Sequence, residues 1–147
     1  MPVLAAEAVW ASRLVPKAAP LPHSSFGASN SPSARKMRTA LGLIRARAPE
    51  LEIDGEMHAD AALIESIRNR AVPDSALSGV ANLLVMPGLD AAHIAFNLLK
   101  AAADAQPVGP ILLGMSRPIH VVAPSVTARG IVNVSAIAAV EAQAGRG

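Results

Sequence analysis

The sequence predicts an α/β fold on two observations. Residues 80–100, VANLLVMPGLDAAHIAFNLLK, form a strand-turn-helix unit: an apolar run over 81–86, the turn pair Pro87-Gly88, and then apolar residues that repeat at spacings of three and four. The composition is 52% hydrophobic but only 2% aromatic, which favours thin layers of helix on sheet over an aromatic-rich β-sandwich. In open α/β sheets, a turn of this kind lies at the carboxyl end of a strand, where ligands bind.

Composition also excludes several classes of protein. The absence of cysteine leaves no disulfide, thiolate nucleophile or Cys-ligated metal, and it fits a reducing cytoplasm. No apolar run approaches the ~20 residues that span a bilayer. The first third of the chain is basic, but it has no run of four basic residues and few aromatic rings to stack on bases. We therefore expect a cytoplasmic globular domain that binds neither nucleic acid nor membrane.

Residues 1–22 are expected to form a poorly ordered arm. They are rich in Ala and Pro, with only a weak helical stretch over residues 5–15. The prolines make the segment VPKAAPL (15–21) a poor strand. Glu7 and the prolines also argue against a transit peptide.

Residues 23–33, HSSFGASNSPS, predict a serine-rich loop that leads into a helix over residues 32–48. Ser31 is placed as the N-cap and Pro32 as the first helical residue. The apolar stripe that we expect to face the core consists of Met37, Leu41, Ile44 and Ala48. Hydroxyl and N–H groups before a helix can hold a phosphate. The same residues also suit an ordinary loop and cap, and both interpretations remain open.

The stretch that follows predicts a short strand over 51–54 and one helix beginning at Asp60, with its apolar face inward. The inward residues are expected to be Ala61, Ile64 and Ile67. Four ionisable residues crowd the approach to this helix: Asp54, Glu56, His58 and Asp60. They alternate at a spacing of two and lack the i, i+4 His pair of a helical zinc site. We expect a cap beside solvated charges, and no metal.

The rest of the chain predicts two more helices and one more strand. Asp90 is placed as the N-cap of a helix running to residue 102. A glycine-bounded apolar segment, GPILLG (109–114), precedes a candidate strand at 119–122. Thr127 can cap a last helix, which has an apolar face made of Ile131, Val134 and Ala138.

Several stretches, taken in order, resemble the carboxyl-terminal part of the phosphate acetyl/butyryltransferase family. They are EIDGEMHADAA (52–62), ANLLVMPGLDAAHIAFNLLK (81–100), GPILLGMSRPIHVV (109–122) and GIVN (130–133). The sequence of these stretches is most similar to the version of that domain appended to NADP-dependent malic enzymes. The resemblance implies that 23–143 is a partial domain and 144–147 a tail. It also implies a three-layer α/β/α fold of the isocitrate/isopropylmalate dehydrogenase type, with an acyl-CoA cleft between two subdomains and dimers as the usual assembly.

The resemblance further implies where catalytic groups should lie. Active family members have a Ser-Arg pair and, six residues after the Arg, an Asp; these positions are Ala123, Pro124 and Gly130 here. The family's Asp takes the CoA thiol proton, and its Ser and Arg hold the phosphate or the developing charge, which Ala, Pro and Gly side chains cannot do. No catalytic residue is therefore expected. The candidate substrate-binding residues are Ser24, Ser25, Gly27, Ser125 and Thr127.

Three functions are compatible with these observations. The first is a catalytically silent, acyl-CoA-responsive or dimerisation module of the kind appended to malic enzymes. The second is an active phosphate acyltransferase that moves an acetyl group between CoA and phosphate, and the third is a non-functional remnant. We expect no cofactor, with acetyl-CoA or acetyl phosphate as a possible ligand. We also expect a homodimer or a malic-enzyme-like partner, because a truncated domain would expose apolar surface.

Overall fold

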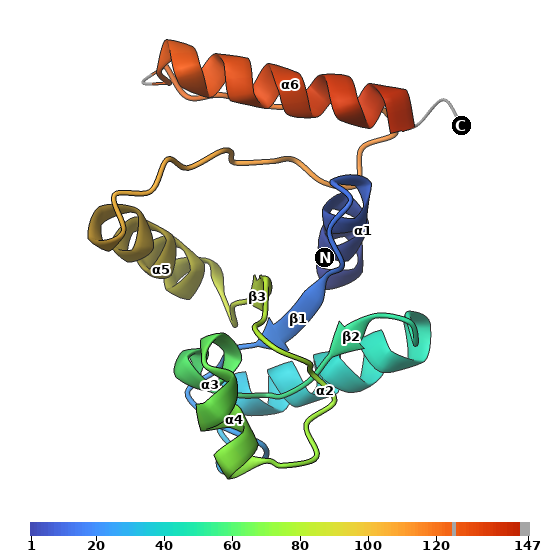
Figure 1. Cartoon of the computed structure of the whole chain (residues 1–147), viewed down its shortest axis with the longest axis vertical. Coiled ribbons are helices and arrows are strands. Elements are labelled where there is room, and N and C mark those ends of the chain that lie inside the picture. The colour runs from blue at the N-terminus through green and yellow to red at the C-terminus, as the bar shows by residue number, and fades with distance from the viewer. Residues whose placement is uncertain (125, 145–147) are drawn as a thin grey trace.

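The computed structural model describes residues 1–124 and 126–144. Figure 1 shows a small parallel sheet with helices around it, and α6 at the end of the molecule farthest from the sheet. The strand order is β2-β1-β3. The elements are α1 (Pro2–Ala11), β1 (Lys17–Pro20), α2 (Pro32–Arg47), β2 (Glu52–Ile53), α3 (Ala59–Leu63), α4 (Glu65–Ala71), β3 (Leu83–Val85), α5 (Leu89–Ala102) and α6 (Ala128–Ala144).

Strand β1 lies at the centre of the sheet, within the segment that the sequence predicted to be a poorly ordered arm. Lys17 and Ala18 pair with β2, and Ala18, Ala19 and Pro20 pair with β3. The proline is tolerated because β2 ends at Ile53, opposite Ala18, so the N–H that Pro20 lacks falls beyond that ladder. Residues 2–11 are helical, and Ala6 is completely buried. The expectation of a disordered arm over 1–22 is therefore wrong for both of these segments.

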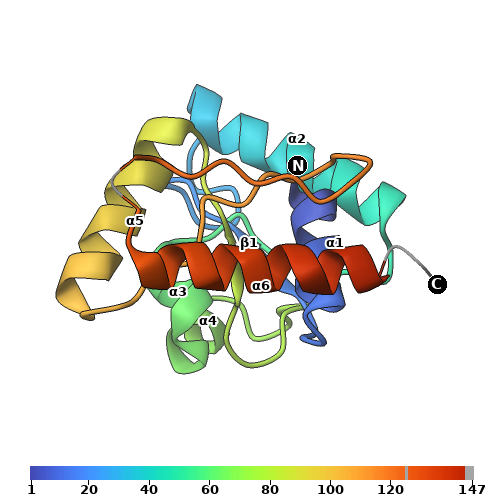
Figure 2. The same cartoon turned by 90° about the horizontal axis from the view of Figure 1, so that it is seen from above.

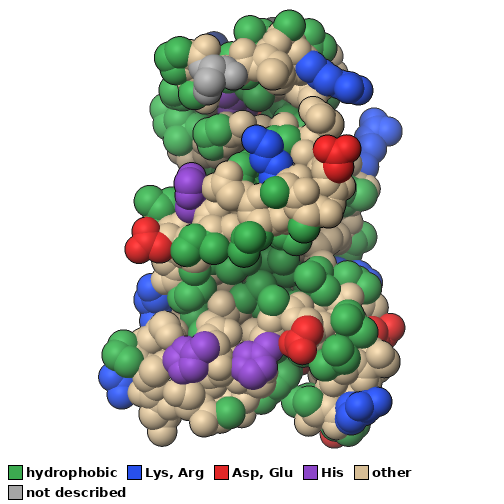
Figure 3. Space-filling model, turned by 90° about the vertical axis from the view of Figure 1, so that its left-hand side faces the viewer, with side chains coloured by type: hydrophobic (Ala, Val, Ile, Leu, Met, Phe, Trp, Pro, Cys, Tyr) green, Lys and Arg blue, Asp and Glu red, His purple; other side chains and the backbone are tan. Residues whose placement is uncertain are grey.

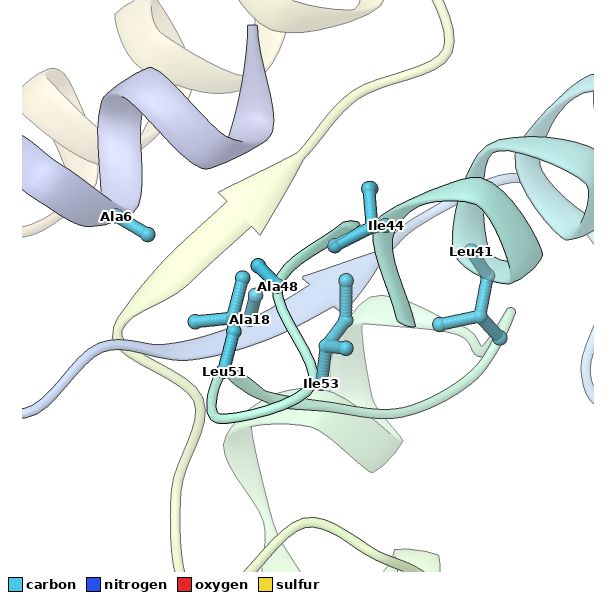
Figure 4. Close-up of a cluster of buried hydrophobic side chains, with 7 residues drawn as sticks. All are labelled: Ala6, Ala18, Leu41, Ile44, Ala48, Leu51 and Ile53. Carbon is cyan, nitrogen blue, oxygen red and sulfur yellow. The ribbon is translucent and has the colours of Figure 1, made fainter. Parts of the chain in front are cut away.

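The sheet has an apolar cluster on each face, because alternate residues of β1 point to opposite sides. Ala18 joins the first cluster, in which α1 and α2 pack against β1 and β2; Figure 4 shows its members, Ala6, Ala18, Leu41, Ile44, Ala48, Leu51 and Ile53. Ala19 and Leu21 join the second cluster, on the α3 side. Helices therefore cover both faces of this small sheet. The finer assignment to a dehydrogenase-like type stays a prediction.

Helix α2 forms as the sequence predicted. Ser31 is its N-cap, and its side chain accepts a hydrogen bond from the Ala34 amide at 3.3 Å, while Pro32 occupies the first turn. The predicted apolar stripe is buried, including Met37 and Leu41. Two arginines, Arg45 and Arg47, lie in its last turn, where cations suit the helix dipole.

The single helix predicted from Asp60 is instead two short helices, α3 and α4, divided at Ile64. Ile64 has extended backbone angles, and its side chain is 47% exposed. His58, not Asp60, is the N-cap of α3. The side chain that α4 buries is Arg68, whose guanidinium donates hydrogen bonds to the carbonyls of Ala61, Leu77 and Gly79. This arginine ties the loop before β3 to α3, and it takes the inward place expected for Ile67.

Helix α5 ends at residue 102 as predicted, but it begins at Leu89, before the Asp90 expected as its N-cap, and its apolar face is largely exposed. Its N-cap is Gly88, with Asp90 in the first turn. None of the described side chains of α5 is buried, although its apolar residues do form a stripe. Strand β3 is only half-buried, because it lies at an edge of the sheet.

The strand predicted at 119–122 does not form, and residues 108–122 have no helix or strand among the residues that the structure describes. Helix α6 follows as expected, with Thr127 capping it: the Thr127 hydroxyl oxygen accepts a hydrogen bond from the Gly130 amide at 3.0 Å. Figure 2 shows α6 crossing over α1 and β1 in the view from above, and α1 contacts α6. Val134 is buried, but Ile131 is 50% exposed. No helix in the described part of the chain is long and apolar enough to cross a membrane.

Replacement of Met57 by Ala tests the cluster on the α3 side. Met57 is fully buried there, so Met57→Ala leaves a cavity and should lower the free energy of unfolding by about 2–5 kcal/mol in urea titrations. The control is Leu43→Ala on α2, whose side chain is 66% exposed and should change stability by less than about 0.5 kcal/mol. Equal effects of the two substitutions would contradict this packing.

Candidate functional site

Loops at the carboxyl ends of the parallel strands bring together the residues of the first candidate site. The serine loop, residues 21–31, follows β1, and residues 54–58 follow β2. The chain passes from β1 to β2 on one side and then crosses to β3 on the other, so β1 lies where the direction of the connections reverses. Such a reversal point is the usual ligand-binding crevice of an open α/β sheet.

Glu56 is the centre of this site, and it is fully buried. Its Oε1 atom accepts hydrogen bonds from the Ser24 hydroxyl at 2.8 Å, the Gly27 amide at 3.0 Å and the Arg38 guanidinium at 2.8 Å. The Glu56 carbonyl also accepts a hydrogen bond from the Phe26 amide at 2.6 Å. A single residue from the β2 loop therefore holds the serine loop and α2 together.

The pKa of Glu56 reflects two opposing effects. Burial raises it, because a low-dielectric site disfavours the charged carboxylate. The hydrogen bonds from Gly27, Ser24 and Arg38 favour the carboxylate and outweigh burial, so the pKa lies below its ordinary value of 4.5. The carboxylate is thus the form that the loop requires.

Ser24 and Ser25 have different roles in the serine loop. Ser24 is buried; its hydroxyl donates to Glu56 and accepts from the Ser29 amide at 3.0 Å, so its hydrogen-bonding capacity is largely used inside the protein. Ser25 is partly exposed, and its oxygen accepts a hydrogen bond from the His58 amide at 3.0 Å, which leaves its hydroxyl proton free to donate. Gly27 is exposed, with a φ of +87° that favours glycine.

Two exposed histidines flank this loop. The His58 ring donates through Nε2 to the His23 carbonyl at 2.8 Å, and the His23 ring lies 3.4 Å from the Ser33 hydroxyl. Histidine side chains also gather on the lower part of the surface in Figure 3. The ionisable residues that lie close together in the sequence do not form one cluster. Asp54 pairs with Arg45 at 2.7 Å and accepts a hydrogen bond from Ser75, away from Glu56. Among the described residues, no group of His, Asp and Glu could hold a metal ion.

A second candidate site is a cleft of about 770 Å³ between α5 and the start of α6. Ala123, Thr127 and Gly130 line it, together with Lys100 in the last turn of α5 and Asp104 just after that helix. The described lining residues come from α5, α6 and the segment between them, so the serine loop contributes none of them. Of the residues expected to bind a ligand, Ser24, Ser25 and Gly27 are therefore brought together, while Thr127 lies in this separate cleft. Ser125 lies outside the described residues.

Gly130 has a packing role at the α6 end of this cleft. A Cβ atom added at Gly130 would lie 2.8 Å from the Val126 Cγ2 atom and 3.4 Å from the Thr127 hydroxyl oxygen. The glycine therefore allows the last residues before α6 to fold closely over its first turn. Any side chain at this position requires Val126 to move.

Sequence reasoning missed Glu56 and Arg38 as organisers of the serine loop. The signal was present, because Glu56 lies in the crowded stretch 54–60, but its partners are far away in the sequence. Arg38 also donates to the Ser29 carbonyl at 2.8 Å and to the Asn30 side chain at 2.9 Å. Only the pairing of β1 with β2 brings these residues together.

Comparison with known proteins relates this chain to parts of malic enzymes and of phosphate acetyltransferases. The sequence model of the phosphate acetyl/butaryl transferase family matches residues 3–139, and so includes a segment that the resemblance read from the sequence did not reach. The NADP-dependent malic enzyme of Salmonella typhimurium is 56% identical over 142 residues, which is 96% of this chain and 19% of that enzyme. The phosphate acetyltransferase of Paracoccus denitrificans is 41% identical over 126 residues, which is 86% of this chain and 40% of that enzyme.

Two solved phosphotransacetylase structures have a similar backbone. The EutD phosphotransacetylase from Staphylococcus aureus has a TM-score of 0.90 and 30% sequence identity, over 96% of this chain and 44% of that one. A phosphotransacetylase from Streptococcus pyogenes also has a TM-score of 0.90, over 97% of this chain and 43% of that one. This chain therefore spans about a fifth of the malic enzyme and less than half of the acetyltransferases that it matches.

The lowered pKa of Glu56 predicts a specific dependence of stability on pH. The Glu56 carboxyl has a lower pKa in the folded state than in the unfolded state. Its contribution to the free energy of unfolding is therefore present above pH 4.5 and is lost as pH falls through the folded pKa. Glu56→Gln should lower the free energy of unfolding at neutral pH and flatten its decline between about pH 6 and about pH 3. Glu50→Gln, at an exposed carboxylate, should keep the wild-type slope. An unchanged slope in Glu56→Gln would show that the network does not depend on the charge.

Proposed function

Because this chain belongs to the phosphate acetyl/butaryl transferase family, we propose that it binds acyl-CoA, or another phosphate-bearing small molecule, without transferring the acyl group. This is the silent module expected from the resemblance to the domain appended to malic enzymes. The observation that supports it most directly is the lining of the α5–α6 cleft. Ala123 and Gly130, two of the three positions that the resemblance assigns to catalytic groups, face this same cleft.

Acyl transfer from CoA to phosphate needs a base for the thiol proton and donors for the developing negative charge. A methyl group at Ala123, a pyrrolidine ring at Pro124 and a hydrogen at Gly130 supply none of these. Loss of an acid–base or charge-stabilising group commonly lowers the rate by ~10²–10⁴-fold. The loss of three such groups therefore favours binding without turnover.

The cleft nevertheless retains groups that suit an anionic ligand. Lys100 lines it and carries a positive charge, and the Thr127 hydroxyl, which accepts a hydrogen bond from Gly130, can still donate its proton. Thr127 also stands at the start of the 17-residue helix α6, where the helix dipole favours negative charge. A phosphate or diphosphate group of CoA fits these features.

The second candidate function is an active phosphate acyltransferase. One observation favours it: Asp104 lines the same cleft and carries a carboxylate that can accept a proton. In this case Asp104 would replace the base missing at Gly130.

Other parts of the sequence-based hypothesis stay predictions. The isocitrate/isopropylmalate dehydrogenase type of fold is supported by helices on both faces of a parallel sheet. The homodimer and the malic-enzyme-like partner are supported by the exposed apolar residues of α5. A non-functional remnant is the interpretation to adopt if the chain neither melts cooperatively nor responds to a ligand.

Thermal melting with and without acetyl-CoA tests binding. A ligand that binds only the folded state adds ~2.7 kcal/mol of stability at a hundredfold excess over Kd, so the melting temperature should rise by several degrees. Lys100→Ala should weaken binding at least about tenfold, because it removes a charged contact. Arg70→Ala, at another exposed cation in the last turn of a helix, should leave binding unchanged. The absence of any shift would contradict the proposal.

A chimera tests catalytic silence. When this chain replaces the equivalent part of the Paracoccus denitrificans phosphate acetyltransferase, phosphate-dependent release of CoA from acetyl-CoA should fall by at least ~10⁴-fold. Restoration by Ala123→Ser, Pro124→Arg and Gly130→Asp, with Val126→Ala to make space, should recover at least ~10²-fold of that loss. An active unsubstituted chimera that loses its activity with Asp104→Asn would instead establish the second candidate.

A further inference from the structure

The chain has only three lysines, and the structure places them in three different environments. Lys17 is half-buried, and its ammonium donates hydrogen bonds to the carbonyl and to the hydroxyl of Ser78, both at 2.9 Å. Lys36 is exposed, but its ammonium donates to the Pro87 carbonyl. Lys100 is exposed, and none of the hydrogen bonds or ion pairs among the described residues involves its side chain. Its amine is therefore the lysine amine that internal contacts leave available.

Lys100 also differs from the other two lysines because it lines the α5–α6 cleft. It lies in the last turn of α5, and Figures 1 and 2 both show the start of α6 on the α5 side of the molecule. Among the described residues that line the cleft, Lys100 is the one cation and Asp104 the one acid. An anionic ligand that enters the cleft is therefore attracted to the Lys100 side chain.

The α6 side of the cleft offers a donor for a phosphate group. Thr127 and Gly130 line the cleft there, and the Thr127 hydroxyl oxygen accepts a hydrogen bond from the Gly130 amide at 3.0 Å. The Thr127 proton is therefore free to donate to a phosphate oxygen. In an acyl phosphate, one oxygen atom joins the phosphorus to the reactive carbonyl carbon. A cleft that holds the phosphate between Thr127 and Lys100 therefore also holds that carbonyl close to the lysine.

We infer that Lys100 is an acyl acceptor, and that its amine takes the acyl group of an acyl phosphate held in the α5–α6 cleft. The inference rests on the proposed binding of phosphate-bearing acyl compounds by this cleft. The Lys100 ammonium first gives a proton to water or to the Asp104 carboxylate. The amine nitrogen then bonds to the carbonyl carbon, the bond from that carbon to the phosphate oxygen breaks, and inorganic phosphate leaves. The products are an amide, phosphate and one proton, with no change of oxidation state.

Binding in the cleft gives Lys100 an advantage that the other lysines lack. Only the neutral amine of a lysine is a nucleophile, and it is a minor form at neutral pH, so lysines in solution react slowly with acyl phosphates. A donor held beside the amine raises the effective concentration of the reacting carbonyl. Lys17 and Lys36 do not line this cleft, so they react only with the donor in solution.

Acylation of Lys100 also limits further binding. The amide has no charge, so the modified cleft keeps Asp104 as the one charged group among its described lining residues. A carboxylate without the lysine repels an anionic ligand. A chain exposed to an excess of acyl phosphate therefore loses its affinity for phosphate-bearing ligands as the modification accumulates.

The test is incubation of the full chain with millimolar acetyl phosphate, followed by peptide mass mapping of the three lysines. Lys100 should be acetylated at least ~10-fold faster than Lys17 or Lys36. Nitrophenyl acetate, a neutral acyl donor without phosphate, measures the reactivity of the three amines in the absence of phosphate binding, and the preference for Lys100 should fall below ~3-fold. The preference should also be larger with acetyl phosphate than with acetyl-CoA, and the reverse order would overturn the assignment of an acyl phosphate as the donor.

Two variants and a competitor connect the reaction to the cleft. Thr127→Val removes the hydroxyl that donates to the phosphate, and it should lower the preference for Lys100 at least ~5-fold. Thr127→Ser keeps the hydroxyl and should keep the preference. Excess inorganic phosphate should slow acetylation of Lys100 but not of Lys17 or Lys36, because only Lys100 reacts with bound donor.

The outcomes separate this inference from the proposed binding function. An equal preference for Lys100 with acetyl phosphate and with nitrophenyl acetate would overturn the inference, because Lys100 would then be only the most accessible amine. CoA binds through the same phosphate groups as acetyl-CoA but carries no acyl group. If CoA raises the melting temperature while Lys100 shows no preference with acetyl phosphate, the inference fails and the binding function stands. If neither the melting shift nor the preference is found, both fail.

Discussion

The amino-terminal half of this protein depends on β1, a four-residue strand whose two middle residues are small and completely buried. Ala18 and Ala19 are completely buried, and each faces a different apolar cluster. Because both are small, helices α2 and α3 can pack closely on opposite faces of a sheet only three strands wide. Strand β1 also pairs with both of the other strands, so its position fixes the loops that follow β1 and β2. The serine loop and Glu56 meet only because those two strands are adjacent.

Local sequence patterns predicted the elements that are stabilised mainly by local contacts. They failed for elements whose structure depends on residues distant in the sequence. Helix α2 was predictable because its cap, its proline and its apolar stripe are all contained in one segment. Strand β1 was missed because the cost of a proline depends on the register with β2, which the sequence does not contain. The burial of Arg68 in place of Ile67 depends on carbonyls from the loop before β3. The strand expected at 119–122 has the right residues, but a strand needs a neighbour to pair with.

The same distinction applies to the candidate site. The serine loop was visible in the sequence as a set of hydroxyl groups, but its two adjacent serines serve different ends. Ser24 is a structural residue, with its hydroxyl committed to Glu56, whereas Ser25 and Gly27 remain accessible. The arrangement separates a buried charged support from an exposed polar rim. A ligand of the serine loop would therefore contact the rim, while Glu56 and Arg38 keep the rim in shape.

The close approach of Val126 to Gly130 constrains the order in which this protein can change. A Cβ atom at position 130 would lie only 2.8 Å from the Val126 Cγ2 atom, so Val126 would have to move, and a valine side chain has few alternative rotamers. An acidic residue at 130 is therefore disfavoured until position 126 carries a smaller side chain. In evolutionary terms Val126 acts as a ratchet: the gain of an acidic side chain at position 130 first needs an enabling substitution at position 126, which adds no acid of its own.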